Sequence, residues 1–238
     1  MSHRSPTPSL APRFAVVPRV FLAAAVVALA ALAAALTIPA AAVAGDRAGD
    51  LETIVLPAPE TSGGMPLLSA IAARRSQRAF APEPLPLPVL STLLWAAWGV
   101  TRPETGHRAA PSAHNRQATD LYVVLAAGTY RYDAQDHALV PIMAGDLRPL
   151  TGRQDFVTSA PVNLVFVERL PADVDESTLI WAGSHAGFIS ENVYLYCASA
   201  NLATVVRGWV DGEALAEALG LPTGHRVLLA QTVGYPAN

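Results

Sequence analysis

The 238-residue chain has no lysine, and all 16 of its basic residues are arginines. This absence excludes a lysine Schiff base, a lysine general base and a phosphate-binding loop that ends in Gly-Lys. The Gly-x-Gly-x-x-Gly pattern of Rossmann dinucleotide sites is missing as well. Cationic side-chain contacts to an anionic ligand must therefore come mainly from arginine.

Cysteine and histidine are also scarce. Cys197 is the only cysteine, which excludes an intrachain disulfide, and its apolar neighbours predict a buried core thiol. The six histidines show neither His-x-x-x-His nor His-Glu-x-x-His spacing, so we predict no metal site. A triad drawn from Ser112, His185 and Asp211 lacks the Gly-x-Ser-x-Gly turn that would support it. The sequence thus argues against zinc and serine hydrolases.

The first 44 residues have the pattern of an export signal. Arg4, Arg13 and Arg19 precede an apolar run from Val20 to Ile38, and Ala42-Val43-Ala44 provides the small residues that a signal peptidase reads. A run of this length also fits an uncleaved anchor. We predict that residues 1–44 are a signal peptide cleaved after Ala44, with an inner-membrane anchor as the alternative. In either case the folded part is exported, to the periplasm or another extracytoplasmic site.

Cleavage would leave 13 basic and 19 acidic residues, a formal charge of −6. Such a surface has no general attraction for nucleic acid or anionic lipid. We therefore expect no nucleic-acid partner, and contact with a membrane only through the N-terminal segment if it is uncleaved.

The remaining chain is expected to form one domain. Residues 45–65 lack periodicity and are interpreted as a linker, and residues 66–238 as the domain. The expected helices are Pro66 to Arg75, Pro88 to Trp98, Thr178 to Val206 with an interruption near Gly187, and Glu213 to Leu219; the expected strands are Leu121 to Ala126, Thr129 to Asp133, His137 to Pro141, Val162 to Val167 and Arg226 to Val233. Because regular βαβ alternation is missing, we predict an α+β fold with helices around a mixed or antiparallel sheet.

Two segments suggest a binding site. Arg74, Arg75, Ser76 and Arg78 follow the first expected helix, and guanidinium groups match the geometry of phosphate oxygens. Taken alone, an arginine-rich helix end is more typical of solvated surface. The segment from Pro111 to Gln117 supports the binding interpretation, because it is a rigid polar loop that precedes a buried strand.

These segments, Arg74 to Phe80 and Ala110 to Gln117, resemble the nitroreductase family of FMN-dependent oxidoreductases. Three later stretches resemble the same family in the same order, namely Gly128 to Asp133, Ala186 to Leu195 and Val233 to Pro236. Each motif is weak by itself, and their order and spacing carry the resemblance. The SagB-type dehydrogenases are the most similar branch.

The resemblance implies an intertwined homodimer with FMN bound between the subunits. One half of each FMN site would contain Arg74, Arg75, Ser76 and Arg78, and the other subunit would contribute Pro111, Ser112, Ala113 and Asn115. The flavin carries the hydride chemistry in such proteins, so we assign no catalytic acid or base. Relatives often add a basic residue after the last strand, whereas this sequence ends at Asn238; Arg207 is a candidate substitute, or a surface residue.

We therefore predict an oxidoreductase that passes two electrons through FMN from a reduced donor, such as NAD(P)H, to a small organic acceptor by a ping-pong scheme. One alternative is a SagB-like dehydrogenase of peptide heterocycles. The other is a non-enzymatic flavin- or ligand-binding module, favoured by the short C-terminus and by the lack of NAD(P)H outside the cytoplasm. His114 and His185 are interpreted as hydrogen-bonding residues rather than contacts to flavin or substrate.

Overall fold

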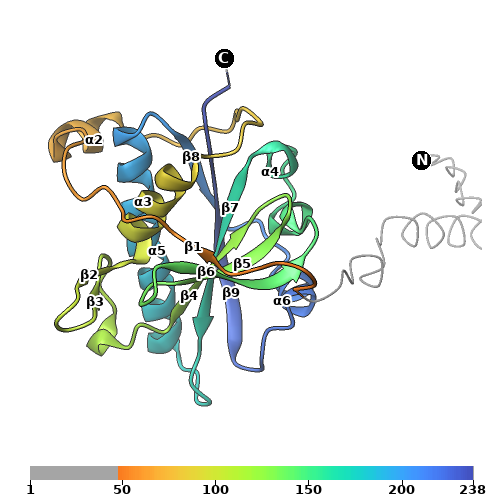
Figure 1. Ribbon diagram of the computed structural model, residues 1–238. Coiled ribbons are helices and arrows are strands. Elements are labelled where there is room, and N and C mark those ends of the chain that lie inside the picture. Colours follow the sequence, from red (N-terminus) through yellow and green to blue (C-terminus); the bar gives the residue numbers. More distant parts are fainter. Residues whose placement is uncertain (1–47, 238) are drawn as a thin grey trace, which may run out of the picture. The chain divides into compact units, whose positions relative to one another are not determined.

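An antiparallel sheet lies at the centre of residues 48–237, the part of the chain that the computed structural model describes (Figure 1). Within this part the sheet has seven strands in the order β1 (Ile54–Val55), β6 (Ala138–Ala144), β5 (Gly128–Asp133), β4 (Thr119–Val124), β7 (Val162–Arg169), β9 (His225–Gly234) and β8 (Ala203–Arg207). Each neighbouring pair is antiparallel. The predicted export signal lies outside the described residues and stays a prediction.

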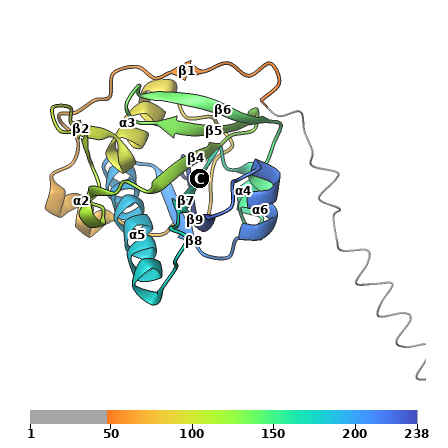
Figure 2. The same ribbon diagram turned by 90° about the horizontal axis from the view of Figure 1, so that it is seen from below.

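Helices cover both faces of the sheet. The helices α3 (Leu87–Trp98) and α5 (Glu176–Ser199) lie on one face, and α4 (Phe156–Ser159) and α6 (Gly212–Leu219) lie on the other (Figure 2). Side chains of β7 alternate between the layers: Leu164 and Phe166 pack in the cluster that contains α3 and α5, while Val165 packs with α6. Burial on both faces explains why β7 is a continuous apolar run in the sequence.

The remaining elements are short. Helix α2 (Leu67–Ala73) precedes α3, and a small hairpin of β2 (Val100–Arg102) and β3 (His107–Arg108) follows it. The 3₁₀ turns are η2 (Ala113–Asn115) and η3 (Arg148–Thr151). In residues 48–237 every helix is too short or too polar to cross a bilayer.

The start and stop signals in the sequence correctly located two helices. Helix α3 spans Leu87–Trp98 against the predicted Pro88 to Trp98, and Gly99 follows it as the predicted stop. Helix α6 begins at Asp211, whose carboxylate accepts the Ala214 N–H at 3.2 Å, and ends at Gly220 in the left-handed conformation with φ of 63°. These signals depend only on neighbouring residues, which is why the sequence alone reveals them. The α+β class and the antiparallel sheet are also confirmed.

The prediction for the central helix was wrong in two respects. Helix α5 is continuous through Gly187, and it ends at Ser199 rather than continuing to Val206. Asn201 adopts a positive φ of 54°, and the chain then forms β8 beside β9. Thr204, Val205 and Val206 are β-branched and suit a strand. The apolar run was long enough for one helix, but pairing with β9 divides it into a helix and a strand.

Two segments near the N-terminal side of the domain also differ from expectation. Within the predicted linker, Ile54 and Val55 pair with β6, and Leu56 is buried in the core, so the folded part begins before Pro66. The large apolar residues of α2 do not enter the core: Leu68 is 79% exposed, and Leu67 and Ile71 are exposed as well, whereas the small Ala70 is buried. Helix α2 therefore leaves an apolar face without a partner in the described part of the chain.

Candidate functional site

The arginine-rich segment is fixed along the edge strand β8. Helix α2 ends at Arg74, where the backbone becomes extended with ψ of 127°. The Gln77 N–H donates to the Thr204 carbonyl at 2.9 Å, and Phe80 forms an isolated antiparallel bridge with Pro236. Because main-chain bonds fasten this segment at two places, its side chains project from a defined backbone.

Tyr194 on α5 contacts both the arginine-rich segment and strand β8. Its hydroxyl lies 2.7 Å from Ser76 Oγ and accepts the Val206 N–H at 3.0 Å. The Arg74 guanidinium lies over the Tyr194 ring, 5.2 Å from its centroid, as in a cation–π contact. The phenol can donate its own proton to Ser76, which leaves the Ser76 hydroxyl proton available to a ligand.

The three arginines of this segment have no acidic partner in the part of the chain that the structure describes. Among residues 48–237 no carboxylate forms an ion pair with Arg74, Arg75 or Arg78, and the latter two are exposed. Arg75 lines a small pocket of about 180 Å³ together with Tyr194 and Thr204. Three guanidinium groups and a hydroxyl donor within five consecutive residues fit a phosphate-bearing ligand such as FMN.

The second predicted segment is a tightly folded turn. His114, Asn115 and Gln117 have positive φ values of 52°, 52° and 48°. Ser112 Oγ accepts the Gln117 N–H at 3.0 Å, and the Gln117 side chain donates to Asn115 Oδ1 at 3.0 Å. Pro111 is exposed, and Ser112 and Ala113 are half-buried. These bonds hold the loop in shape and leave the Asn115 amide N–H groups free to donate.

A buried pair of side chains connects this loop to the core. The Ala113 N–H lies 2.9 Å from His185 Nε2, and His185 Nδ1 lies 3.0 Å from Glu168 Oε1. Thr119 Oγ donates to the other oxygen of Glu168 at 2.5 Å. The His185 and Glu168 side chains are 4% and 5% exposed. Residues of α5, β7 and β4 thus jointly fix the position of the loop.

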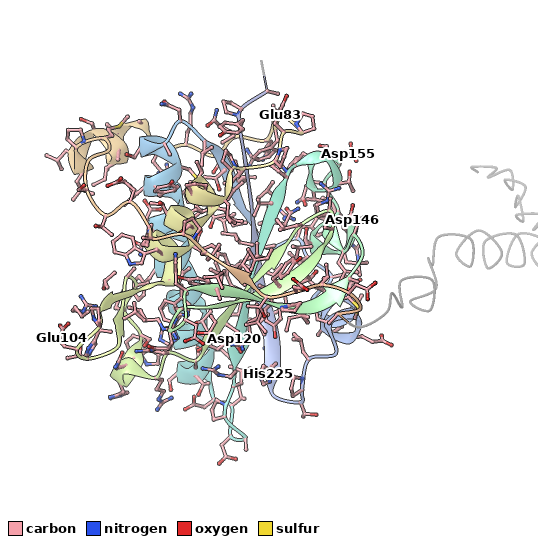
Figure 3. The ribbon with its side chains drawn as sticks, in the orientation of Figure 1. Glu83, Glu104, Asp120, Asp146, Asp155 and His225 are labelled. Atoms are coloured by element: carbon pink, nitrogen blue, oxygen red, sulfur yellow. The ribbon has the colours of Figure 1, made fainter. Side chains whose placement is uncertain are left out.

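The structure does not bring the two predicted halves together within one chain. His185 and Tyr194, which contact one half each, are nine residues apart on α5, or about 13 Å along a helix axis. Figure 3 shows Glu83, which follows the arginine segment, and Asp120, which follows the loop, at opposite ends of the sheet. Among the described residues no hydrogen bond joins the two segments.

Arg207 is neither a substitute phosphate ligand nor a surface residue. It is 5% exposed and points to the face of the sheet opposite α5, where it donates to the Thr151 carbonyl at 2.6 Å and to Asn163 Oδ1 at 2.9 Å. Burial lowers the pKa of Arg207 to about 10. A Cβ on Gly152 would lie only 1.9 Å from its Nη1, so glycine is needed there. Strand alternation explains the burial, because Val206 faces Tyr194 and Arg207 must face the other layer.

Sequence reasoning missed three residues of this region. Tyr194 lies in a stretch that resembles the family, but nothing local indicates that it contacts Ser76. Glu168 is an acid at the end of a buried apolar strand, a position that usually requires a partner. Trp181 stacks on His185 with centroids 6.4 Å apart. The prediction that His185 has a hydrogen-bonding role agrees with its contacts, and Cys197 is fully buried with a raised pKa, as expected of a core thiol.

The fold and these segments place the chain in a known class of proteins. The Nitroreductase family model matches residues 71–235, which is more than half of the chain and includes both segments. The chain belongs to the nitroreductase family, and it is an oxidoreductase of that family.

Individual relatives agree with this assignment. A protein of Methanocaldococcus jannaschii described as a nitroreductase is 31% identical over 179 residues, which are 69% of this chain and 88% of the relative. The crystal structure of a Ralstonia eutropha protein described as a nitroreductase is 45% identical with a TM-score of 0.76, covering 80% of this chain and 92% of that one. The NADPH:FMN oxidoreductase of Vibrio harveyi, complexed with NAD⁺, shares the fold at 22% identity and a TM-score of 0.54, covering 72% and 69%.

Proposed function

We propose that this protein is an FMN-dependent oxidoreductase that passes two electrons from a reduced donor to a small organic acceptor. The observation that carries the proposal is the set of three guanidinium groups beside Ser76, which have no acidic partner in the described part of the chain. Unpaired cations on a fixed backbone suit a phosphate-bearing cofactor. The Vibrio harveyi protein of the same fold, named as an NADPH:FMN oxidoreductase, supports the choice of FMN.

The residues would divide the work of binding. Arg74, Arg75 and Arg78 would hold the phosphate and the polar edge of the cofactor, with Ser76 as a further donor. Ser112, Ala113 and Asn115 would contact the flavin from the other side. FMN, when bound, would supply the hydride chemistry, and the protein would pass two electrons from a donor such as NAD(P)H to the acceptor in a ping-pong scheme. Donors near the pyrimidine edge would stabilise the negative charge of the reduced state.

We infer that the two halves of each site come from two copies of this chain. Within one chain they are attached to different parts of α5, so a second copy is needed to complete a site. Exposed apolar side chains on α2 and α5 support this arrangement. Leu68 on α2 is 79% exposed, and Ile180 and Trp181 on α5 are 60% and 51% exposed. Groups of exposed apolar residues often mark interaction surfaces.

Absorbance of the purified protein tests the proposal. We expect noncovalent FMN, with bands in the blue and near ultraviolet. Arg78→Ala should weaken FMN binding by roughly ten- to a hundredfold, because a charge-assisted contact is worth about 1.5 to 3 kcal/mol. Arg153→Ala is the matched control, since Arg153 is an exposed arginine beside Asp211 on the opposite layer.

Loss of colour on adding NAD(P)H, and its return with an acceptor, separates an oxidoreductase from a ligand-binding module.

Two results would contradict this assignment. Colourless protein that also fails to take up added FMN would exclude the flavin hypothesis. Equal FMN affinity in Arg78→Ala and Arg153→Ala would show that Arg78 is a solvated surface residue without a role in binding FMN. The more specific SagB-type assignment stays a prediction.

A further inference from the structure

The contacts of His185 allow only one arrangement of its protons. A backbone N–H can only donate, so the 2.9 Å contact with Ala113 requires an unprotonated Nε2. The ring proton is then on Nδ1, from which it donates to Glu168 Oε1 at 3.0 Å. Thr119 donates to the second carboxylate oxygen. In this series of hydrogen bonds, Ala113 donates to His185 and His185 donates to Glu168, while Thr119 on β4 donates to Glu168 from the other side.

The groups that hold His185 belong to rigid elements. Glu168 lies on β7 and Thr119 on β4, two paired central strands. The Thr119 carbonyl accepts the Trp98 Nε1–H at 2.9 Å, so Thr119 is also fixed from α3. Trp181 covers the imidazole, with ring planes 26° apart. Because the ring cannot rotate without breaking these contacts, Nε2 is an acceptor at a fixed position.

The loop that His185 holds needs such a support. His114, Asn115 and Gln117 all have positive φ, a conformation that residues other than glycine adopt rarely. The bond from Gln117 to Ser112 closes the loop on itself, and Gln117 at its end is held by Arg108, Gly106 and Arg169. The bond from Ala113 to His185 connects the beginning of the loop to α5. Without that bond the beginning of the loop could shift while its end stays attached to the domain.

We propose that His185, oriented by Glu168, is a positioning residue that places the Pro111–Gln117 loop for binding FMN. This inference rests on the proposed function. His185 does not touch the cofactor in this scheme; it acts through the main chain of Ala113. The side chain matters for its hydrogen-bond acceptor at the Nε2 position rather than for its charge.

Two substitutions of His185 separate positioning from general packing. In His185→Gln the amide oxygen can take the place of Nε2 and accept the Ala113 N–H. In His185→Asn the shorter amide can still reach Glu168 from the Nδ1 position but offers no acceptor to the loop. Full-length protein, in the form that the host processes, is compared by hydrogen–deuterium exchange in residues 111–117 and 119–124 and by titration with FMN.

We expect His185→Asn to exchange faster in residues 111–117 but not in β4, and to bind FMN about tenfold more weakly. His185→Gln should stay within about threefold of the native protein in FMN affinity. If His185→Asn does not fold, Ala113→Pro removes the same N–H donor from the loop side, and the extended backbone of Ser112, with φ of −138° and ψ of 148°, is compatible with a following proline. Because Ala113 itself lies in the proposed site, this variant should show faster exchange in residues 111–117 without a change in β4, in addition to weaker FMN binding.

Several outcomes would overturn the inference. Native FMN affinity in His185→Asn or Ala113→Pro would show that the cofactor does not need this bond. Equal weakening in His185→Gln and His185→Asn, or faster exchange throughout β4, would give His185 a packing role. If the native protein takes up no FMN, the proposed function fails first, and the inference fails with it even if the exchange pattern is as expected.

Discussion

At the scale of single residues, arginine has two opposite roles in this protein. Arg75 and Arg78 are exposed and form no ion pair with an acidic residue among residues 48–237, which suits a binding site. Arg207 is buried, and neutral acceptors surround it: the Thr151 carbonyl, Gln154, Asn163 and Thr232. Since no carboxylate of the described residues pairs with Arg207, its hydrogen bonds must offset the cost of burial. Arg207 is therefore a structural centre that joins η3 and α4 to the sheet.

Replacement of Arg207 by lysine should destabilise the domain. The change keeps the charge but removes the planar group that reaches several acceptors at once, leaving buried oxygen atoms without donors. We expect a loss of about 2 to 3 kcal/mol in the free energy of unfolding, measured by urea denaturation. Arg226→Lys, at an exposed position, is the control. Equal stability of the two variants would show that the network around Arg207 contributes little.

At the scale of elements, α5 connects the two candidate half-sites. Its N-terminal half carries Trp181 and His185, and its C-terminal half carries Tyr194. Asp175 begins the helix, and its carboxylate accepts the N–H and hydroxyl of Thr178 at 2.7 and 2.6 Å. The hydrogen bond from the Thr178 side chain is the main reason that the pKa of Asp175 falls from 3.8 to about 2. The start of α5 is thus sensitive to protonation of one carboxyl group.

Asp175 should contribute a pH-dependent part of the stability. Because its pKa is lower in the folded state, its contribution is fully present above pH 3.8 and is lost as the pH falls toward about 2. At pH 7, Asp175→Ala should lower the melting temperature more than Asp175→Asn, because asparagine keeps a capping oxygen but lacks the charge of the carboxylate. Circular dichroism melts between pH 3.8 and about 2 should show that the difference in melting temperature between the native protein and Asp175→Asn shrinks as the pH falls. An advantage that does not change with pH would contradict the assignment.

At the scale of the whole molecule, the completed site requires association of two chains in our proposal. The same chain exposes apolar side chains on α2 and α5 and keeps its two candidate half-sites apart. A two-fold symmetric pair would create two equivalent sites, each with one half from each copy. Substitutions in different halves should therefore complement one another in mixed dimers.

Mixing Arg74→Ala protein with Asn115→Ala protein tests this arrangement. Each variant alone lacks an intact site, but a mixed dimer regains one site of its two. Random exchange at equal amounts should restore about a quarter of the native FMN-binding capacity. The control mixes Arg74→Ala protein with the doubly substituted Arg74→Ala/Asn115→Ala protein, in which every site keeps a defect. Subunit exchange without recovery of bound FMN would contradict a shared site.

The sequence by itself determined much of this protein. Caps and breakers located α3 and α6, because a proline, an aspartate or a glycine at a helix end acts through bonds to its neighbours. Apolar runs located β4, β7 and β9, and the order of weak motifs identified the family before any fold was known. Both arginine and loop segments were found for the same reason, since each is continuous in the chain.

Tertiary structure alone decided the features that depend on distant partners. Pairing with β9 made β8 a strand, and strand alternation buried Arg207 on the face opposite Tyr194. The apolar face of α2 remained exposed because no described element covers it, although its periodicity resembles that of a core helix. Glu168 and His185 are 17 residues apart and meet only because β7 and α5 pack together. Local pattern predicts where an element forms, but the packing of elements determines which side chains are buried and which residues meet.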